Sequence, residues 1–195
     1  MPTQTAEAQL ITILQSAASG ELAAGFAYRG HAASVRSGAE HTRLQEIEQE
    51  EWHHRALVSG LLADLGGGPS PSREVVFWMI GRTIAILCRV GGWFLPMYGA
   101  GRLERGNIEE YEAAARYAAE SGHTEMIDCL LTMAEVEWEH EFYFRERIRG
   151  HWLTGVFPLW QAPPARESIR AGFQSWVTKR GSENVERTVS VMSGV

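Results

Sequence analysis

Four pairs of a glutamate and a histidine three residues further on are the clearest chemical signal in this chain. They are Glu50–His53, Glu51–His54, Glu120–His123 and Glu137–His140. Side chains three residues apart lie on one face of an α-helix, so each pair could offer a carboxylate and an imidazole to one divalent cation. Because such pairs also occur by chance, the helix face on which each pair lies must decide which pairs bind a metal.

The hydrophobic pattern of residues 40–65 separates the two overlapping pairs. One stripe of the expected helix contains Leu44, Ile47, Glu51, His54, Val58, Leu61 and Leu65. A stripe that is apolar except for one carboxylate and one imidazole is typical of a core-facing surface. The neighbouring stripe, which contains Glu50 and His53, is mostly polar. We therefore expect Glu51 and His54 to point into the core and Glu50 and His53 to face solvent.

Three other expected helices carry acidic residues in the middle of an apolar stripe. These residues are Glu21 in 4–36, Glu104 in 93–121, and Glu137 with His140 in 124–149. Tyr28 follows Glu21 by seven residues, and Tyr111 follows Glu104 at the same spacing. The same order therefore occurs twice: a helix with a glutamate and a tyrosine is followed by a helix with a Glu-x-x-His pair. Such a repeat is expected for a bundle with near two-fold symmetry.

Four carboxylates and two imidazoles would then share one layer of the bundle core. Isolated charges are expensive to bury, so four unpaired carboxylates would strongly destabilise the fold, and two divalent cations would balance them. One glutamate from each of two helices and a Glu-x-x-His pair from each of two others form the ligand set of ferritin-like di-iron and di-manganese proteins. The sequence therefore predicts two bound iron ions, with manganese as the alternative metal. The expected ligands are Glu21, Glu51, His54, Glu104, Glu137 and His140.

The elements that must position these residues are all expected to be helical. Clusters of glycine, proline and serine divide the chain into helices at about 4–36, 40–65, 72–90, 93–121 and 124–149, with Ser72 as an N-cap. Glutamate, arginine, alanine and leucine favour helix, and no stretch alternates with the period of a strand. The predicted fold class is all-α: a ferritin-like four-helix bundle with a long crossover segment between helices two and three and a C-terminal arm.

The chain is expected to divide into a bundle of residues 4–150 and an arm of residues 151–195. Prolines at 158, 163 and 164 interrupt the arm, and a short amphipathic helix is expected at about 167–177. The polar residues that follow are expected to form a mobile tail.

Composition limits the classes of function. The net charge of −6 and the lack of a basic run argue against nucleic-acid binding. The only cysteines, Cys88 and Cys129, form no C-x-x-C pattern, which excludes an appended rubredoxin-like module and fits a reducing cytoplasm. The first basic residue is Arg29, so no secretory signal is expected. Arginines at 82 and 89 interrupt the most apolar stretch, and no transmembrane segment is expected.

Several motifs resemble the demethoxyubiquinone hydroxylase family. GELAAGFAYRGH (20–31) and RLERGNIEEY (102–111) resemble its first and third helices, in which a glutamate precedes a tyrosine by seven residues. EEWHHR (50–55) and EWEH (137–140) occupy its two Glu-x-x-His positions, and Pro69 follows Glu51 at the family's spacing. The resemblance covers about residues 10–145. His31 replaces a glutamine of the family, and the segment after residue 145 is polar and broken by proline instead of apolar.

The resemblance implies a ferritin-like bundle that binds two irons, activates O2 and hydroxylates an aromatic quinone ring. It places Tyr28 and Tyr111 near the metals as candidate catalytic residues, with core aromatics that hydrogen-bond through their hydroxyl groups as the alternative reading. Because the segment after residue 145 departs from the family, the metal centre carries over better than the quinone substrate.

We therefore expect an O2-dependent di-iron monooxygenase that acts on an apolar or aromatic small molecule and takes electrons from an external donor. The alternatives are a rubrerythrin-like peroxidase, a ferritin-like protein that oxidises and stores iron, and a metal-free helical interaction module. Peripheral membrane contact and a homo-oligomer are also expected.

Other residues are assigned by their position on the expected helices. Trp78, Met79, Trp93 and Met97 are expected to be core residues, or to line a substrate pocket or docking surface. His31 is expected to pack in the core or support the ligands. Solvated faces are expected to contain Glu109, Glu110, Glu112, Glu139 and Glu141.

Overall fold

The computed structural model describes residues 5–36 and 38–193, and the side chains of those up to residue 183. Its helices are α1 (Ala6–Ser34), α2 (Ala39–Asp64), α3 (Pro71–Val90), α4 (Phe94–Ser121), α5 (Ile127–Ile148) and α6 (Glu167–Ser193), with short 3₁₀ turns η1 (Thr124–Met126) and η2 (Trp152–Gly155). No strand occurs among these residues. The predicted all-α class is confirmed.

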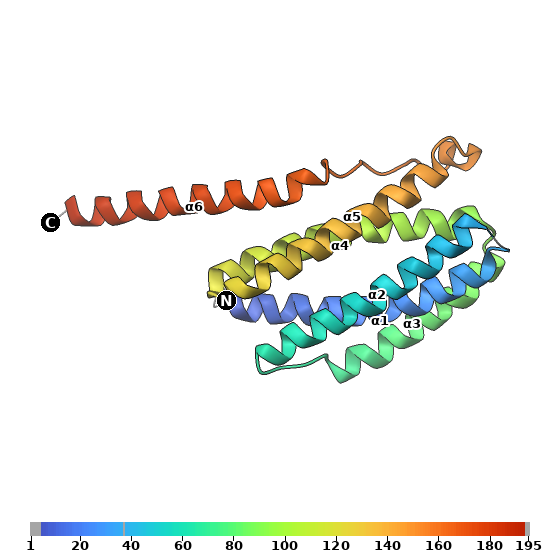
Figure 1. Ribbon diagram of the computed structural model, residues 1–195, viewed down its shortest axis with the longest axis horizontal. Helices are drawn as coiled ribbons and strands as arrows, with labels where there is room; N and C mark the ends of the chain where they lie inside the picture. The colour runs from blue at the N-terminus through green and yellow to red at the C-terminus, as the bar shows by residue number, and fades with distance from the viewer. Residues whose placement is uncertain (1–4, 37, 194–195) are drawn as a thin grey trace.

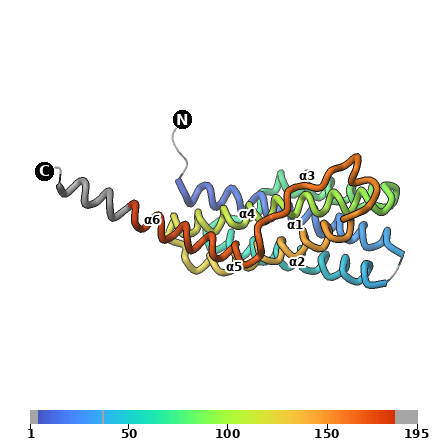
Figure 2. Tube along the Cα trace, turned by 90° about the horizontal axis from the view of Figure 1, so that it is seen from above, coloured from blue at the N-terminus to red at the C-terminus, as the bar shows by residue number. Residues whose placement is uncertain are grey.

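Four of the helices, α1, α2, α4 and α5, form a bundle. Helix α1 packs against α2 and α4, and α4 packs against α5. Helix α3 lies on the outer side of α1 and carries the chain back along the bundle, so that α2 and α4 run in the same direction (Figure 1). Figure 2 shows the segment after α5 turning back along the bundle before α6 begins.

Two predicted helix boundaries were wrong. Helix α3 begins at Pro71 after Ser70, and not after Ser72, because proline fits the first helical turn, where its missing N–H is not needed. Helix α6 was expected to end near residue 177 and instead runs to Ser193. No proline interrupts residues 178–193, so nothing in that stretch stops the helix, and the predicted mobile tail is helical over this range.

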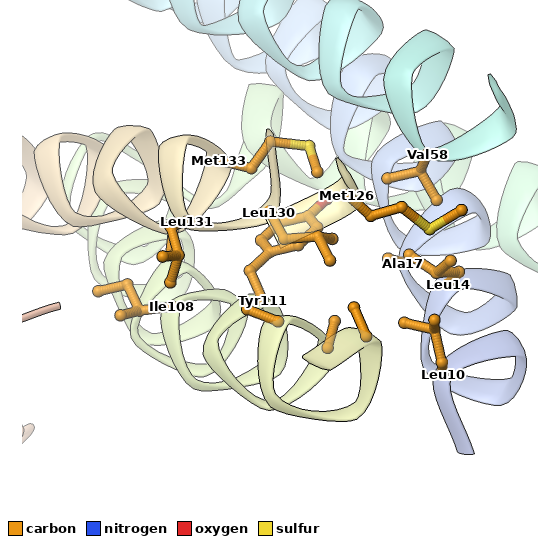
Figure 3. Close-up of a cluster of buried hydrophobic side chains, with 14 of the residues drawn as sticks. Leu10, Leu14, Ala17, Val58, Ile108, Tyr111, Met126, Leu130, Leu131 and Met133 are labelled. Atoms are coloured by element: carbon orange, nitrogen blue, oxygen red, sulfur yellow. The ribbon is translucent and has the colours of Figure 1, made fainter. Parts of the chain in front are cut away.

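The core consists of two apolar clusters, one on each side of the predicted metal layer. The first lies between α1, α2, α4 and α5 and includes Leu10, Leu14, Val58, Tyr111, Leu130 and Met133 (Figure 3). The second includes Tyr28, Leu44, Ile47, Phe94, Met97, Phe144 and Ile148. The first turns of α6 add Ile169 and Phe173 to the first cluster, so part of the C-terminal arm belongs to the core.

Close contact between α1 and α3 depends on two glycines. A Cβ atom on Gly30 would lie 2.3 Å from the Cα of Ala85, and one on Gly81 would lie 2.5 Å from the carbonyl oxygen of Ala23. Both contacts are shorter than van der Waals packing allows. The small residues therefore let α3 lie directly on the outer face of α1.

Among the described helices, only α1 is long and apolar enough to cross a membrane by composition. The mean hydropathy of its best window is 1.2, and 44% of that window is buried in the bundle. A buried core helix and a signal sequence meet the same criteria, so the composition of α1 is weak evidence for a membrane span.

Candidate metal centre

The six predicted ligands lie in one layer between the two apolar clusters, and none is more than 3% exposed. Helix α1 supplies Glu21, α2 supplies Glu51 and His54, α4 supplies Glu104, and α5 supplies Glu137 and His140. The structure therefore brings all six predicted ligands together from four helices.

Their ligand atoms form two overlapping groups. One group is Glu21, Glu51, His54 and Glu137, and the other is Glu51, Glu104, Glu137 and His140. Within each group the atoms lie within 4.8 Å of one another. The two groups share Glu51 and Glu137, so the buried cluster offers two neighbouring positions that could each hold a metal ion.

Several polar atoms of the cluster lack the partners that burial requires. Both carboxylate oxygens of Glu51, Oε2 of Glu21 and Nδ1 of His140 are buried without a hydrogen bond. Leaving such atoms unsatisfied destabilises a protein by about 1–3 kcal/mol each, and more where the group is charged. Cations fit this set of oxygen and nitrogen donors, because a cation would satisfy the unpaired atoms and offset the negative charge together.

The protonation of the cluster follows from its burial. Burial and the neighbouring carboxylates raise the pKa of Glu51 and of Glu104 well above the usual range. Burial also acts to raise the pKa of Glu137, but the adjacent imidazoles of His140 and His54 outweigh it and hold that pKa well below the usual range. The pKa of His140 is raised, because its carboxylate partners outweigh the effect of burial. Protons thus take the place of cations in the metal-free cluster.

Two tyrosines make crossed hydrogen bonds to the cluster. Tyr28 of α1 donates to Glu104 of α4, and Tyr111 of α4 donates to Glu21 of α1. Each phenol therefore donates to a glutamate on the other helix, and not to the glutamate seven residues before it on its own helix. Burial and nearby carboxylates raise the pKa of both tyrosines well above 10, so both remain donors.

Asn107 is a site residue that the sequence analysis did not single out. Its Nδ2 donates to Oε2 of Glu104 at 2.9 Å and to Oε2 of Glu137 at 3.3 Å. Its position three residues after Glu104 on the same apolar stripe was the signal that could have identified it.

The prediction that Glu50 faces solvent was wrong. Its side chain is 37% exposed, yet Oε2 lies 2.7 Å from Nε2 of His140, and Oε1 accepts from Arg43 at 3.0 Å. Burial opposes ionisation of Glu50, but the hydrogen bonds from His140 and Arg43 outweigh it and lower its pKa to about 2. The Glu50 side chain is long enough to reach past the edge of the core-facing stripe to His140. His53, in contrast, is exposed as predicted.

The prediction for Glu141 was also wrong. It is fully buried, and its Oε1 accepts from Nε of Arg145 at 2.9 Å and from Nε1 of Trp160 at 2.7 Å. Trp160 belongs to the C-terminal arm, which covers this face of α5. Of the other glutamates placed on solvated faces, Glu109 and Glu139 are exposed, whereas Glu110 and Glu112 are partly buried.

The remaining predicted residues lie outside the ligand groups. His31 is buried and stacks near Tyr28 and Phe144, with ring centroids 6.4 and 6.1 Å away. Burial lowers the pKa of His31 to about 4, so its ring is neutral. Met97 is a core residue, as expected. Trp78 and Met79 are about half exposed, so the core prediction was wrong for both.

The metal-free protein is expected to lose stability as the pH rises from about 5 to about 8. In the folded state the raised pKa values keep protons on Glu51, Glu104 and His140, whereas the unfolded chain releases them above the ordinary values of 4.5 and 6.5. The folded state then binds more protons than the unfolded state, so the free energy of unfolding falls with increasing pH. Urea unfolding at several pH values, in the presence of a chelator, would measure this fall in the free energy of unfolding.

A Glu51→Gln variant is the control for this pH dependence. It lacks one of the titrating groups and should show a shallower slope. A free energy of unfolding that increases over the same pH range would contradict the assignment.

The buried cluster of carboxylates and imidazoles, whose two groups share Glu51 and Glu137, is the chemically distinctive feature of this molecule. Comparison with protein-family models, with curated proteins and with solved structures finds no match to this chain. Its function must therefore be inferred from the geometry and chemistry of this cluster.

Proposed function

We propose that this protein is a ferritin-like di-iron carboxylate oxidoreductase that uses O2, similar to the demethoxyubiquinone hydroxylases. The observation that carries the proposal is the pair of buried ligand groups that share Glu51 and Glu137. The helix order supports it, since α3 forms a single long crossover between α2 and α4, as in ferritin-like folds (Figure 1).

The donor set favours a pair of divalent transition metals. Carboxylates and imidazoles together suit Fe(II) or Mn(II), and two divalent cations match the charge of four carboxylates. Glu21 and His54 would complete one position, and Glu104 and His140 the other. When bound, a pair of reduced irons supplies the electrons and the coordination positions that activate O2.

The chain's own residues would orient this chemistry and protect it. The hydrogen bonds of Tyr28 and Tyr111 fix the carboxylates of Glu104 and Glu21, and each phenol could supply a proton at that carboxylate. The apolar clusters on both sides exclude water from the layer. Such a site is suited to directing an oxidant at an apolar substrate.

The metal content of variants at Glu51, at His54 and at the neighbouring His53 tests the site directly. The unmodified protein should contain about two irons per chain after preparation from iron-replete cells. His54→Ala should reduce this to about one, because it removes a ligand of one position. Glu51→Ala should leave almost none, since Glu51 is shared by both positions.

His53→Ala is the matched control, because His53 is exposed on the same helix and should leave the content near two. Elemental analysis of the purified proteins gives the readout. Equal metal content in all variants would refute the two-metal site.

The reaction with O2 separates the three candidate activities. Hydroxylation inserts one oxygen atom of O2 into a C–H bond and reduces the other to water, with two electrons and two protons from an external donor. We therefore expect that a soluble quinone or phenol will accelerate O2 uptake by the reduced iron-loaded protein, with one atom of labelled oxygen found in the product by mass spectrometry.

The other outcomes identify the alternatives. Faster consumption of hydrogen peroxide than of O2, with no labelled product, would indicate a rubrerythrin-like peroxidase. Ferric absorbance that continues to grow well beyond two irons per chain would indicate iron storage. Either result would contradict the hydroxylase proposal.

The exposed face of α3 supports peripheral membrane contact. Its exposed apolar residues are Val75, Val76, Trp78, Met79, Ile80, Ile86, Leu87 and Val90. A groove of about 210 Å³ between α1 and α3 has an apolar floor and is lined by Arg29, Arg82 and Arg89. The only acidic residue of α3, Glu74, pairs with Arg55 of α2. A second copy of this face would bring arginines together, so an anionic lipid surface is the better complement.

Vesicle binding tests this contact. The protein should sediment with vesicles that contain anionic phosphatidylglycerol and much less with pure phosphatidylcholine. Loss of both charges in an Arg82→Gln/Arg89→Gln variant should weaken binding roughly thirtyfold, at about 1 kcal/mol per arginine. Lys179→Gln, which removes a charge from α6, is the control and should bind normally. Binding that is independent of lipid charge would contradict the proposal.

A further inference from the structure

We infer that the two metal positions are unequal, and that the position completed by Glu104 and His140 fills first because Glu50 and Asn107 hold its ligands in place. This inference rests on the two-metal site proposed above. It assigns positioning roles to Glu50 and Asn107, neither of which belongs to the predicted ligand set.

The two imidazoles differ in what supports them. Nδ1 of His140 faces the shared carboxylates, 3.1 Å from Glu51 and 3.7 Å from Glu137. Its opposite nitrogen, Nε2, lies 2.7 Å from Glu50. Donation from Nε2–H to this carboxylate leaves Nδ1 as the nitrogen that can bind a cation, and it fixes the rotation of the ring.

The carboxylate of Glu50 is itself held in place. Its other oxygen accepts from Arg43, at 3.0 Å, and Arg43 forms no hydrogen bond or ion pair with the six ligands in the described part of the chain. A chain of contacts therefore runs from the surface of α2 through Glu50 to His140 on α5.

His54 has no such support. Its Nδ1 also faces the cluster, 2.8 Å from Glu137. No residue in the described part of the chain hydrogen-bonds to its Nε2. The ring of His54 is therefore held by packing and by its contact with the cluster alone.

The terminal glutamates show the same inequality. Asn107 donates to Glu104 and also to the shared Glu137. The equivalent position on α1, three residues after Glu21, is Ala24, which has no side-chain donor. The tyrosine bonds do not distinguish the positions, because each terminal glutamate accepts one.

Both additional contacts thus fall on the same half of a nearly two-fold site. The residue before Glu51 is Glu50, whereas the residue before Glu137 is Val136. Ligands that are already oriented lose less conformational freedom when a metal binds, and removal of such supporting contacts typically weakens metal affinity 10–100-fold. The supported position should therefore bind the first metal ion.

Stepwise titration of the metal-free protein with Co(II) tests the inference. Calorimetry and the visible absorption of bound Co(II) should resolve a tight step and a weaker step. Glu50→Ala should weaken the tight step about 10–100-fold and leave the weaker step unchanged. Asn107→Ala should act in the same direction. Glu50→Gln keeps an oxygen that accepts from His140 and should retain most of the affinity.

Two further variants complete the test. Glu46→Ala is the matched control, because Glu46 accepts from the same Arg43 but forms no hydrogen bond or ion pair with the six ligands in the described part of the chain, and both steps should persist. His54→Ala should remove the weaker step and leave the tight one. Circular dichroism of each metal-free variant would show that it folds.

Two equal steps in the unmodified protein, or an unchanged tight step in Glu50→Ala, would overturn the inequality while leaving the two-metal site standing. Failure of the unmodified protein to bind Co(II) would overturn both.

Discussion

Four carboxylates buried in one layer of a helical bundle are the constraint on which the rest of this structure depends. The backbones of α2 and α5 come close together only over a short stretch. Between these helices the contacts run instead through ligand side chains, such as His54 with Glu137 and His140 with Glu51. One side of the bundle is therefore closed by polar groups that need protons or cations to coexist. The binding of cations by this cluster would therefore be coupled to folding through the same atoms.

The surrounding structure keeps these atoms in a dry and fixed environment. Apolar clusters lie on either side of the layer, so water cannot solvate the carboxylates from the ends of the bundle. The crossed bonds of Tyr28 and Tyr111 tie α1 to α4 at the level of the ligands. A buried hydroxyl that donates to a carboxylate satisfies its own hydrogen bond and holds the carboxylate in place, so each tyrosine contributes to both stability and positioning.

Helical periodicity was sufficient to predict the all-α class and the six residues that meet in the core. It was sufficient because a core-facing stripe of about 3.6-residue period contains Glu51 and His54 among apolar neighbours. It failed for Glu50 and Glu141, for a common reason. Periodicity places a side chain on a helix face but does not show how far it reaches or which distant segment covers it. Glu50 reaches His140 on α5, and Trp160 of the arm covers Glu141.

The repeated order of helices and the differences between the two halves have separate consequences. The repeat supplies matching ligands, which by themselves would hold two equivalent metal ions. In the proposed hydroxylation, reduction of O2 toward one substrate would be directional, so equivalent positions would give no preferred side for substrate or donor. A preferred side for substrate and donor would have to come from the features that differ between the two halves of the bundle. These include Glu50, Asn107, the exposed helix α3 and the arm that covers α5, none of which has a counterpart in the other half of the bundle. Specificity in this fold is therefore to be sought where the two halves differ.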